Sequence, residues 1–264
     1  MPAPLLADYE EPRAAFRALL EPACDNRILL FSGASGCGKT TLVAACLEDA
    51  RAAGCPTLAF DLRGSANSVP EIFSRLGTRL GWEHLPALAQ QTARLQQAPT
   101  VQIDRTWMFG MGNHIHVALQ AQDPADREER RAALTAALFT DLRARAGRLL
   151  IAIDTYERAI PDVQDWLGGP FLGRLADAPH LRVLIAGQTV PDARHIEWGH
   201  CCDHYPLHGV PDAIHWLPIV KAMNRYIDAP DPLSWLAGIC HYVNGAPKEI
   251  MQVIEALPRL EATA

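Results

Sequence analysis

The sequence feature that most constrains the fold is the glycine-rich run from residue 33 to residue 40, which reads GASGCGKT. Its pattern, G-x-x-x-x-G-K-T, is that of a phosphate-binding loop, in which backbone N–H groups turn inward toward phosphate oxygens. Such a loop requires a strand before it and a helix after it. The flanks agree, because Ile28–Phe31 is an apolar run and Thr41–Glu48 has a helical composition.

Each position of the loop has an expected role in binding ATP or ADP. The Lys39 amine would bridge the outer phosphates, and the Thr40 hydroxyl would hold Mg²⁺. The N-terminus of the following helix adds partial positive charge. Lysine occurs at only three positions of the chain, so a chance match to this pattern is rare. The other expected nucleotide contacts in the loop are Gly33, Ser35, Gly36, Cys37, Gly38 and Thr41.

Composition excludes several classes of protein. No apolar run approaches the length of a membrane-spanning helix, so we expect no membrane association. A formal net charge of −6 argues against nucleic acid as a partner gripped by the whole surface. The seven cysteines have no regular spacing, which favours reduced thiols and a cytoplasmic protein.

Apolar runs alternate with helical patterns along most of the chain, and this alternation predicts an α/β fold. Strands are expected near residues 27–32, 57–61, 149–154, 181–188 and 204–207. Strands separated by helices form a parallel sheet that is covered on both faces. The fold class is therefore the three-layer sandwich of a P-loop NTPase.

The chain is expected to divide into two parts. Residues 1–210 would form the P-loop core, and residues 211–264, with a helical pattern, would form a small helical subdomain. The segment from about 98 to 120 is irregular and contains alternating runs such as Ile115–Leu119. This alternation predicts an inserted β-hairpin in the core, with a surface loop as the alternative.

A phosphate loop also needs acidic and polar residues at neighbouring strand ends. Asp154 follows a run of apolar residues and is expected to hold Mg²⁺ together with Thr40. The next residue is Thr155 rather than a second acid, so Glu157 is the candidate for orienting the attacking water. Glu157 either reaches the γ-phosphate or pairs with Arg158 at the surface. Gln188, at the end of the next strand, is expected to contact the γ-phosphate.

With these motifs placed, the chain resembles the STAND branch of the P-loop NTPases, which are signalling ATPases related to AAA+ proteins. The resemblance also includes the late segment Tyr242–Pro247, which is similar to the family's G-x-P motif. It implies that Pro247 lies against the adenine, and that the Gln188 strand lies between the phosphate-loop strand and the Asp154 strand. It further implies an ATP-driven switch, of bacterial defence or signalling type, that self-associates or activates an effector protein.

Three departures from the family pattern modify this expectation. Gln188 stands where many members carry an arginine, and Thr155 makes ATP hydrolysis slow or uncertain. The family's winged-helix domain and sensor repeats would normally follow residue 264. We therefore expect a switch core or a piece of a longer protein.

Other functions fit the same loop. A small-molecule kinase would need an acceptor site, a helper ATPase acting on DNA would need a basic strip, and a degenerate scaffold would bind no nucleotide. The cysteines and histidines between 199 and 208 have irregular spacing for a zinc site. The arginines that could act in trans across a subunit contact are Arg174, Arg182 and Arg194.

Overall fold

The computed structural model describes residues 5–63, 68–96, 110–120 and 123–260 of the chain. Its centre is a five-stranded parallel sheet with the order β2-β3-β4-β1-β5. β4 lies between β1 and β3, so the predicted α/β fold is confirmed together with its strand order. The strands are β1 (Ile28–Gly33), β2 (Thr57–Asp61), β3 (Leu149–Asp154), β4 (Leu181–Gly187) and β5 (Cys202–Leu207).

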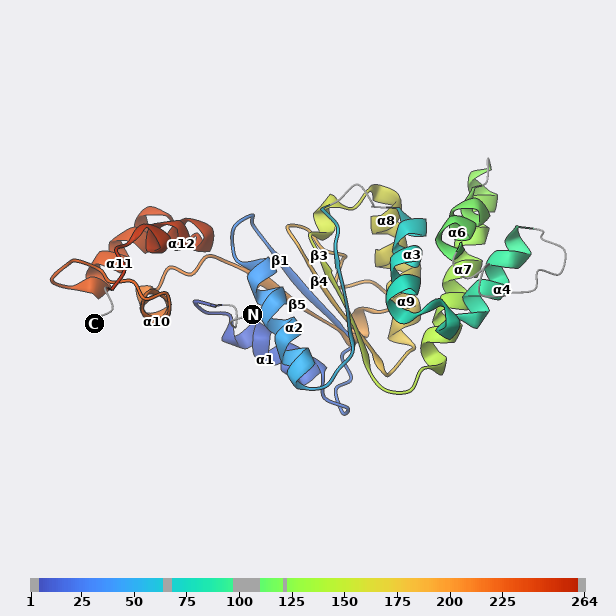
Figure 1. Cartoon of the computed structure of the whole chain (residues 1–264), viewed down its shortest axis with the longest axis horizontal. Coiled ribbons are helices and arrows are strands. Elements are labelled where there is room, and N and C mark those ends of the chain that lie inside the picture. The colour runs from blue at the N-terminus through green and yellow to red at the C-terminus, as the bar shows by residue number, and fades with distance from the viewer. Residues whose placement is uncertain (1–4, 64–67, 97–109, 121–122, 261–264) are drawn as a thin grey trace.

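Helices cover both faces of this sheet (Figure 1). The side chains of its central strands are therefore buried on both sides. Leu29 and Phe31 of β1 face α1 and α2, whereas Ile28 and Leu30 face the opposite layer. The covering helices are α1 (Glu10–Leu19) and α2 (Lys39–Ala52) on one face, and α3 (Val69–Leu80), α8 (Pro161–Trp166) and α9 (Leu172–Ala176) on the other. Short turns of helix are η2 (Tyr156–Arg158), η3 (Leu167–Phe171) and η4 (Gly199–Cys201).

Between β2 and β3 the chain adds helices that pack beyond α3 (Figure 1). The buried Asp141 carboxylate fixes one of them, because it accepts hydrogen bonds from the backbone N–H groups of Ala87 and Leu88 at 2.9 and 2.8 Å. These N–H groups lie in the first turn of a helix, where they have no intrahelical partner. The added elements are η1 (Trp82–His84), α4 (Pro86–Leu95), α6 (Met111–Leu119) and α7 (Pro124–Ala144).

The predicted β-hairpin at 98–120 is wrong where the structure describes it, because residues 111–119 form helix α6. The buried residues of α6 are Met111, Ile115, Ala118 and Leu119, a spacing that matches one face of a helix. The alternating run is so short that it is compatible with the two-residue period of a strand and with the 3.6-residue period of a helix. Packing against α3 and α4 favours the helix. Residues 97–109 lie outside the described residues.

The C-terminal helices have an apolar cluster of their own, which includes Trp216, Leu236 and Ile250. They lie at the end of the molecule next to β1 and β5 (Figure 1, red). The Trp216 indole N–H donates to the Val210 carbonyl at 2.9 Å and so ties this cluster to the chain that leaves β5. The elements are η5 (Ala213–His215), α10 (Leu217–Ala222), α11 (Pro232–Tyr242) and α12 (Pro247–Ala256).

Candidate functional site

The loop between β1 and α2 has the backbone shape that its glycines allow. Gly36 and Gly38 have φ values of 85° and 89°, in the left-handed region that side chains disfavour. Gly33 passes close to β5, and a Cβ there would lie 2.5 Å from the Leu207 carbonyl oxygen. The loop therefore wraps tightly in front of the N-terminus of α2, which provides N–H donors and partial positive charge for an anion.

Lys39 is the first residue of α2, and its amine lies inside the curve of the loop. The Nζ atom donates to the carbonyl oxygens of Gly33 and Ala34 at 2.7 and 2.8 Å, and Lys39 is only 9% exposed. A buried ammonium needs such partners, and phosphate oxygens can replace them. Cys37 is buried with its sulfur 3.7 Å from this amine. Cys37 and Gly33, both predicted nucleotide contacts, are not among the residues that line the cavity described below.

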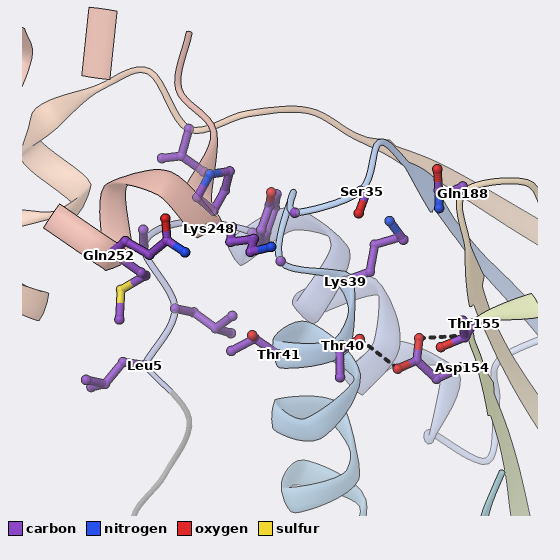
Figure 2. A pocket seen from close by; sticks show the side chains of 18 of the residues that line it. Leu5, Ser35, Lys39, Thr40, Thr41, Asp154, Thr155, Gln188, Lys248 and Gln252 are labelled. Atoms are coloured by element: carbon purple, nitrogen blue, oxygen red, sulfur yellow. Dashed lines mark hydrogen bonds between the residues drawn. The ribbon is translucent and has the colours of Figure 1, made fainter. Parts of the chain in front are cut away.

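Thr40 and Asp154 meet in front of the loop. The Thr40 hydroxyl donates to Asp154 Oδ2 at 2.8 Å, and Asp154 Oδ1 accepts from the Thr155 N–H at 2.8 Å (Figure 2). Asp154 ends the fully buried strand β3, so its carboxylate is fixed at the carboxyl edge of the sheet. A hydroxyl and a carboxylate are oxygen ligands of the kind that Mg²⁺ takes in phosphate-binding sites. The residues present therefore fit that ion.

The chain turns sharply directly after Asp154. Thr155 has a φ of 63°, which is unusual for a β-branched residue, and the turn η2 follows it. This turn brings Glu157 to Gln188, whose backbone N–H and side-chain amide donate to its carboxylate at 2.9 and 3.2 Å. Both residues line the same cavity as Lys39.

The charge state of Glu157 follows from these contacts. Partial burial acts to raise its pKa, but the hydrogen bonds from Gln188 and the nearby Lys39 charge outweigh burial, and the pKa is lowered. Glu157 is therefore ionised at neutral pH. A carboxylate with a lowered pKa is a weak base, so it is better suited to orienting a water molecule than to deprotonating it.

A cavity of about 900 Å³ opens between the phosphate-binding loop and α12. The Lys248 backbone N–H donates to the Gly36 carbonyl at 3.0 Å, which joins the start of α12 directly to the loop. Pro247 lies beside the loop, 4.0 Å from the place of a Cβ on Gly38. The lining from the core includes Ser35, Lys39, Thr40, Thr41, Asp154, Glu157 and Gln188, and the lining from the C-terminal part includes Val210, Trp216, Pro247, Lys248 and Met251.

The sequence analysis missed several residues that line this cavity, and three of them have contacts that bear on the site. The Tyr9 hydroxyl lies within hydrogen-bond distance of two carbonyl oxygens, that of His208 at 2.7 Å and that of Cys37, and its single proton is shared between them. Lys248 lines the cavity, and a signal existed, because it is one of only three lysines in the chain. Arg63 lies beside Thr40 and Thr155 at 3.3 and 3.2 Å, and only the sheet pairing of β2 with β3 places it there.

Arg182, one of the arginines that could act across a subunit contact, and the histidines and cysteines of residues 199–208 have other roles in the structure. Arg182 is 1% exposed and donates to the carbonyl of Leu19 at 2.7 Å, so it holds the end of α1 and does not reach another subunit. His204 lies 2.8 Å from the Ser32 hydroxyl on the neighbouring strand. Within the described residues, no cluster of three His, Cys, Asp or Glu side chains is placed to hold a metal ion.

Searches against known proteins agree with this geometry. The family model described as "AAA ATPase domain" matches residues 10–185, and no curated protein matches. A Walker-type ATPase of Pyrococcus abyssi is similar in structure, with 14% sequence identity and a TM-score of 0.52, over 95% of this chain and 67% of that chain. The ORC1 protein of Aeropyrum pernix, solved in complex with DNA, has 14% identity and a TM-score of 0.47. That match includes 96% of this chain and 61% of the length of the ORC1 protein.

The family model identifies the family of this chain. Because the family model covers well over half of the sequence, the chain belongs to the AAA ATPase domain family. The similarity to the Pyrococcus protein concerns the fold alone, since the identity is only 14%. Among the described helices, none is long and apolar enough to cross a membrane.

Proposed function

We propose that this AAA ATPase domain is an ATP-dependent switch of the STAND type. The observation that carries the proposal is the cavity between the phosphate-binding loop and α12, with its hydrogen bond from Lys248 to Gly36. A nucleotide in this cavity would touch both the core and the helical part from residue 211 onward, which we treat as a subdomain. Its binding free energy would then favour one arrangement of the two parts over others.

In this proposal the loop residues from Gly33 to Thr41 hold the phosphates, and Lys39 exchanges its loop carbonyls for phosphate oxygens. Thr40 and Asp154 hold Mg²⁺, which would neutralise part of the phosphate charge. The adenine lies on the apolar wall made by Val210, Trp216, Pro247 and Met251, opposite the phosphate end.

We further propose that ATP hydrolysis is slow and resets the switch. Thr155 supplies no carboxylate next to Asp154, and Glu157 is a weak base held by Gln188. A γ-phosphate near Gln188 would compete for its amide and so change how Glu157 is held. Gln188 would in this way connect the presence of the γ-phosphate to the position of the water-orienting group.

The partner in this proposal is a second copy of the chain or an effector protein, in a bacterial defence or signalling role. We place the protein in a reducing compartment, the cytoplasm, because all seven of its cysteines are free thiols. Nucleic acid is not assigned as a partner, since the formal net charge is −6.

Size-exclusion chromatography with light scattering tests the switch. The protein is run without nucleotide, with Mg-ADP and with Mg-ATP, and calorimetry measures binding of each nucleotide in parallel. We expect a larger mass with Mg-ATP than with Mg-ADP, and no such change for Asp154→Asn. Binding of both nucleotides with one unchanged mass would reject self-association, and absence of binding would reject the nucleotide site itself.

A further inference from the structure

Arg63 lies two residues after the end of β2, beside the oxygens assigned above to Mg²⁺. Its guanidinium is 3.3 Å from the Thr40 hydroxyl and 3.2 Å from the Thr155 hydroxyl. The same guanidinium is 3.7 Å from Asp154 Oδ2. It also lines the cavity that contains Lys39. One cation of the protein thus contacts both members of the Thr40–Asp154 pair.

Two carboxylates converge on this cation. Asp61 and Asp154 are register partners at the ends of the adjacent strands β2 and β3. Arg63 Nε lies 3.2 Å from Asp61 Oδ2, and the Arg63 backbone N–H donates to Asp61 Oδ1 at 3.0 Å. Two neighbouring carboxylates repel each other, and a positive charge between them removes that repulsion. Arginine suits this place because its guanidinium is always charged and carries five N–H donors.

We propose that the Arg63 side chain competes with Mg²⁺ for the oxygens of Thr40 and Asp154. This inference rests on the nucleotide-and-metal site proposed above. The guanidinium and a hydrated divalent ion need the same two oxygens, so one excludes the other. Displacing Arg63 is inexpensive, because its side chain is 57% exposed and exposed ion pairs are weak. The consequence is a metal site that fills more readily when the ion brings further ligands, such as phosphate oxygens.

Titration with Mn²⁺, followed by electron paramagnetic resonance of the free ion, measures this competition directly. The variants are Arg63→Gln, which removes the charge, and Arg63→Lys, which keeps it. Arg75→Gln is the matched control, because Arg75 pairs with Glu71 on α3 and its loss changes the net charge equally. Each protein is titrated without nucleotide and again with saturating ADP, and circular dichroism verifies that each variant is folded.

We expect Arg63→Gln to bind Mn²⁺ about twofold to fivefold more tightly than the unmodified chain, the range that corresponds to the loss of a partly exposed ion pair. Arg63→Lys and Arg75→Gln should stay close to the unmodified chain, and adding Asp154→Asn to Arg63→Gln should abolish the gain. Unchanged or weaker Mn²⁺ binding by folded Arg63→Gln overturns the inference.

Two separate measurements distinguish the proposed nucleotide site from the proposed role of Arg63: ADP binding tests the first, and Mn²⁺ affinity tests the second. Calorimetry with Mg-ADP tests nucleotide binding, so absence of ADP binding rejects the nucleotide site. A gain in Mn²⁺ affinity for Arg63→Gln without nucleotide would still support competition by Arg63. Normal ADP binding with no gain in Mn²⁺ affinity would reject the role of Arg63 alone.

Discussion

Thr155 determines which acid reaches the cavity. Its φ of 63° reverses the chain directly after Asp154, and the turn η2 then carries Glu157 to the amide of Gln188. The sequence left two places open for Glu157, beside the nucleotide or beside Arg158. The conformation of Thr155 brings Glu157 to the cavity wall, next to Gln188. Glu157 as a water-orienting group remains a proposal.

Lys39 and Lys221 allow a matched test of the phosphate site. Lys39 is buried with its amine inside the loop, whereas Lys221 is exposed on α10. Loss of a charge-assisted hydrogen bond costs about 1.5–3 kcal/mol, so Lys39→Ala should weaken ADP binding by about tenfold to a hundredfold. Calorimetry of Lys39→Ala and Lys221→Ala measures the difference. Equal affinities for the two variants would reject Lys39 as a phosphate ligand.

Glu157→Gln tests the water-orienting role. The amide is close in size to the carboxylate but carries no charge, so we expect ATP hydrolysis to fall by about a hundredfold, as for a reacting group that is no longer correctly positioned. ADP affinity should change by less than about threefold, because Glu157 is assigned to water and not to the diphosphate. Glu21→Gln, at an exposed position after α1, is the control. Undiminished hydrolysis by Glu157→Gln would contradict the assignment.

Helix α6 illustrates how packing decides an element. In a strand, Ile115 and Val117 would share one face, but in the helix Ile115 is fully buried and Val117 is 53% exposed. Ile115→Ala should therefore lower the free energy of unfolding by about 2–4 kcal/mol, and Val117→Ala by less than about 0.5 kcal/mol. Urea denaturation followed by circular dichroism compares the two. Similar losses would contradict the helix.

Helices α1 and α2 are joined by a charged contact that should depend on pH. Asp49 on α2 accepts from Arg13 at 2.8 and 2.7 Å and from Arg17 at 3.0 Å. The hydrogen bond from Arg13 is the main reason that the pKa of Asp49 is lowered. We expect Asp49→Asn to lower the free energy of unfolding by about 1–2 kcal/mol at neutral pH. Glu48→Gln removes the same charge one residue earlier and serves as the control.

The sign of the pH effect follows from the lowered pKa. An acid whose pKa is lower in the folded state stabilises the protein above its unfolded pKa, which is about 3.9 for aspartate. This stabilisation is lost as the pH falls through the folded pKa. Denaturation curves should show a constant difference between Asp49→Asn and the unmodified chain at higher pH, shrinking below about pH 4. A difference that grows with acidification would contradict the ion pair.

At the scale of the whole molecule, the cavity is built from three distant parts of the chain. The N-terminal segment contributes Tyr9, the core contributes the phosphate-binding loop, and the C-terminal helices contribute Pro247 and Lys248. Tyr9 connects all three, because its hydroxyl shares one proton between the carbonyl of Cys37 in the loop and the carbonyl of His208 on the chain that leads to the helices. Burial is the main reason that its pKa is raised, so the hydroxyl stays protonated and remains a donor.

Tyr9→Phe tests this connection with the loss of one oxygen atom. We expect the free energy of unfolding to fall by about 1–2 kcal/mol, and ADP binding to weaken several-fold, because the loop loses one of its supports. Tyr242→Phe is the control, since Tyr242 is 88% exposed. Thermal unfolding and calorimetry measure the two effects. An ADP affinity for Tyr9→Phe equal to that of Tyr242→Phe would reject the coupling of the three parts through Tyr9.

The amino-acid sequence alone was enough to predict the loop and the strands, because these follow from local patterns, whereas the strand order was implied by the resemblance to a known family. Gly36 and Gly38 allow the left-handed backbone conformation that the loop needs. The five apolar residues before Asp154 predict a buried strand. Pairing of Thr40 with Asp154 followed as well, since loop and strand end at the same edge of a parallel sheet.

Only the tertiary structure decided the rest of the site, because these contacts join residues far apart in sequence. Gln188 meets Glu157 across 31 positions, and Arg63 meets Thr155 across 92 positions. Neither pair leaves a periodic trace in the sequence, as each depends on which strands are neighbours and how their ends turn. The same reason explains α6, where burial against other helices, and not the local pattern, selected the helix.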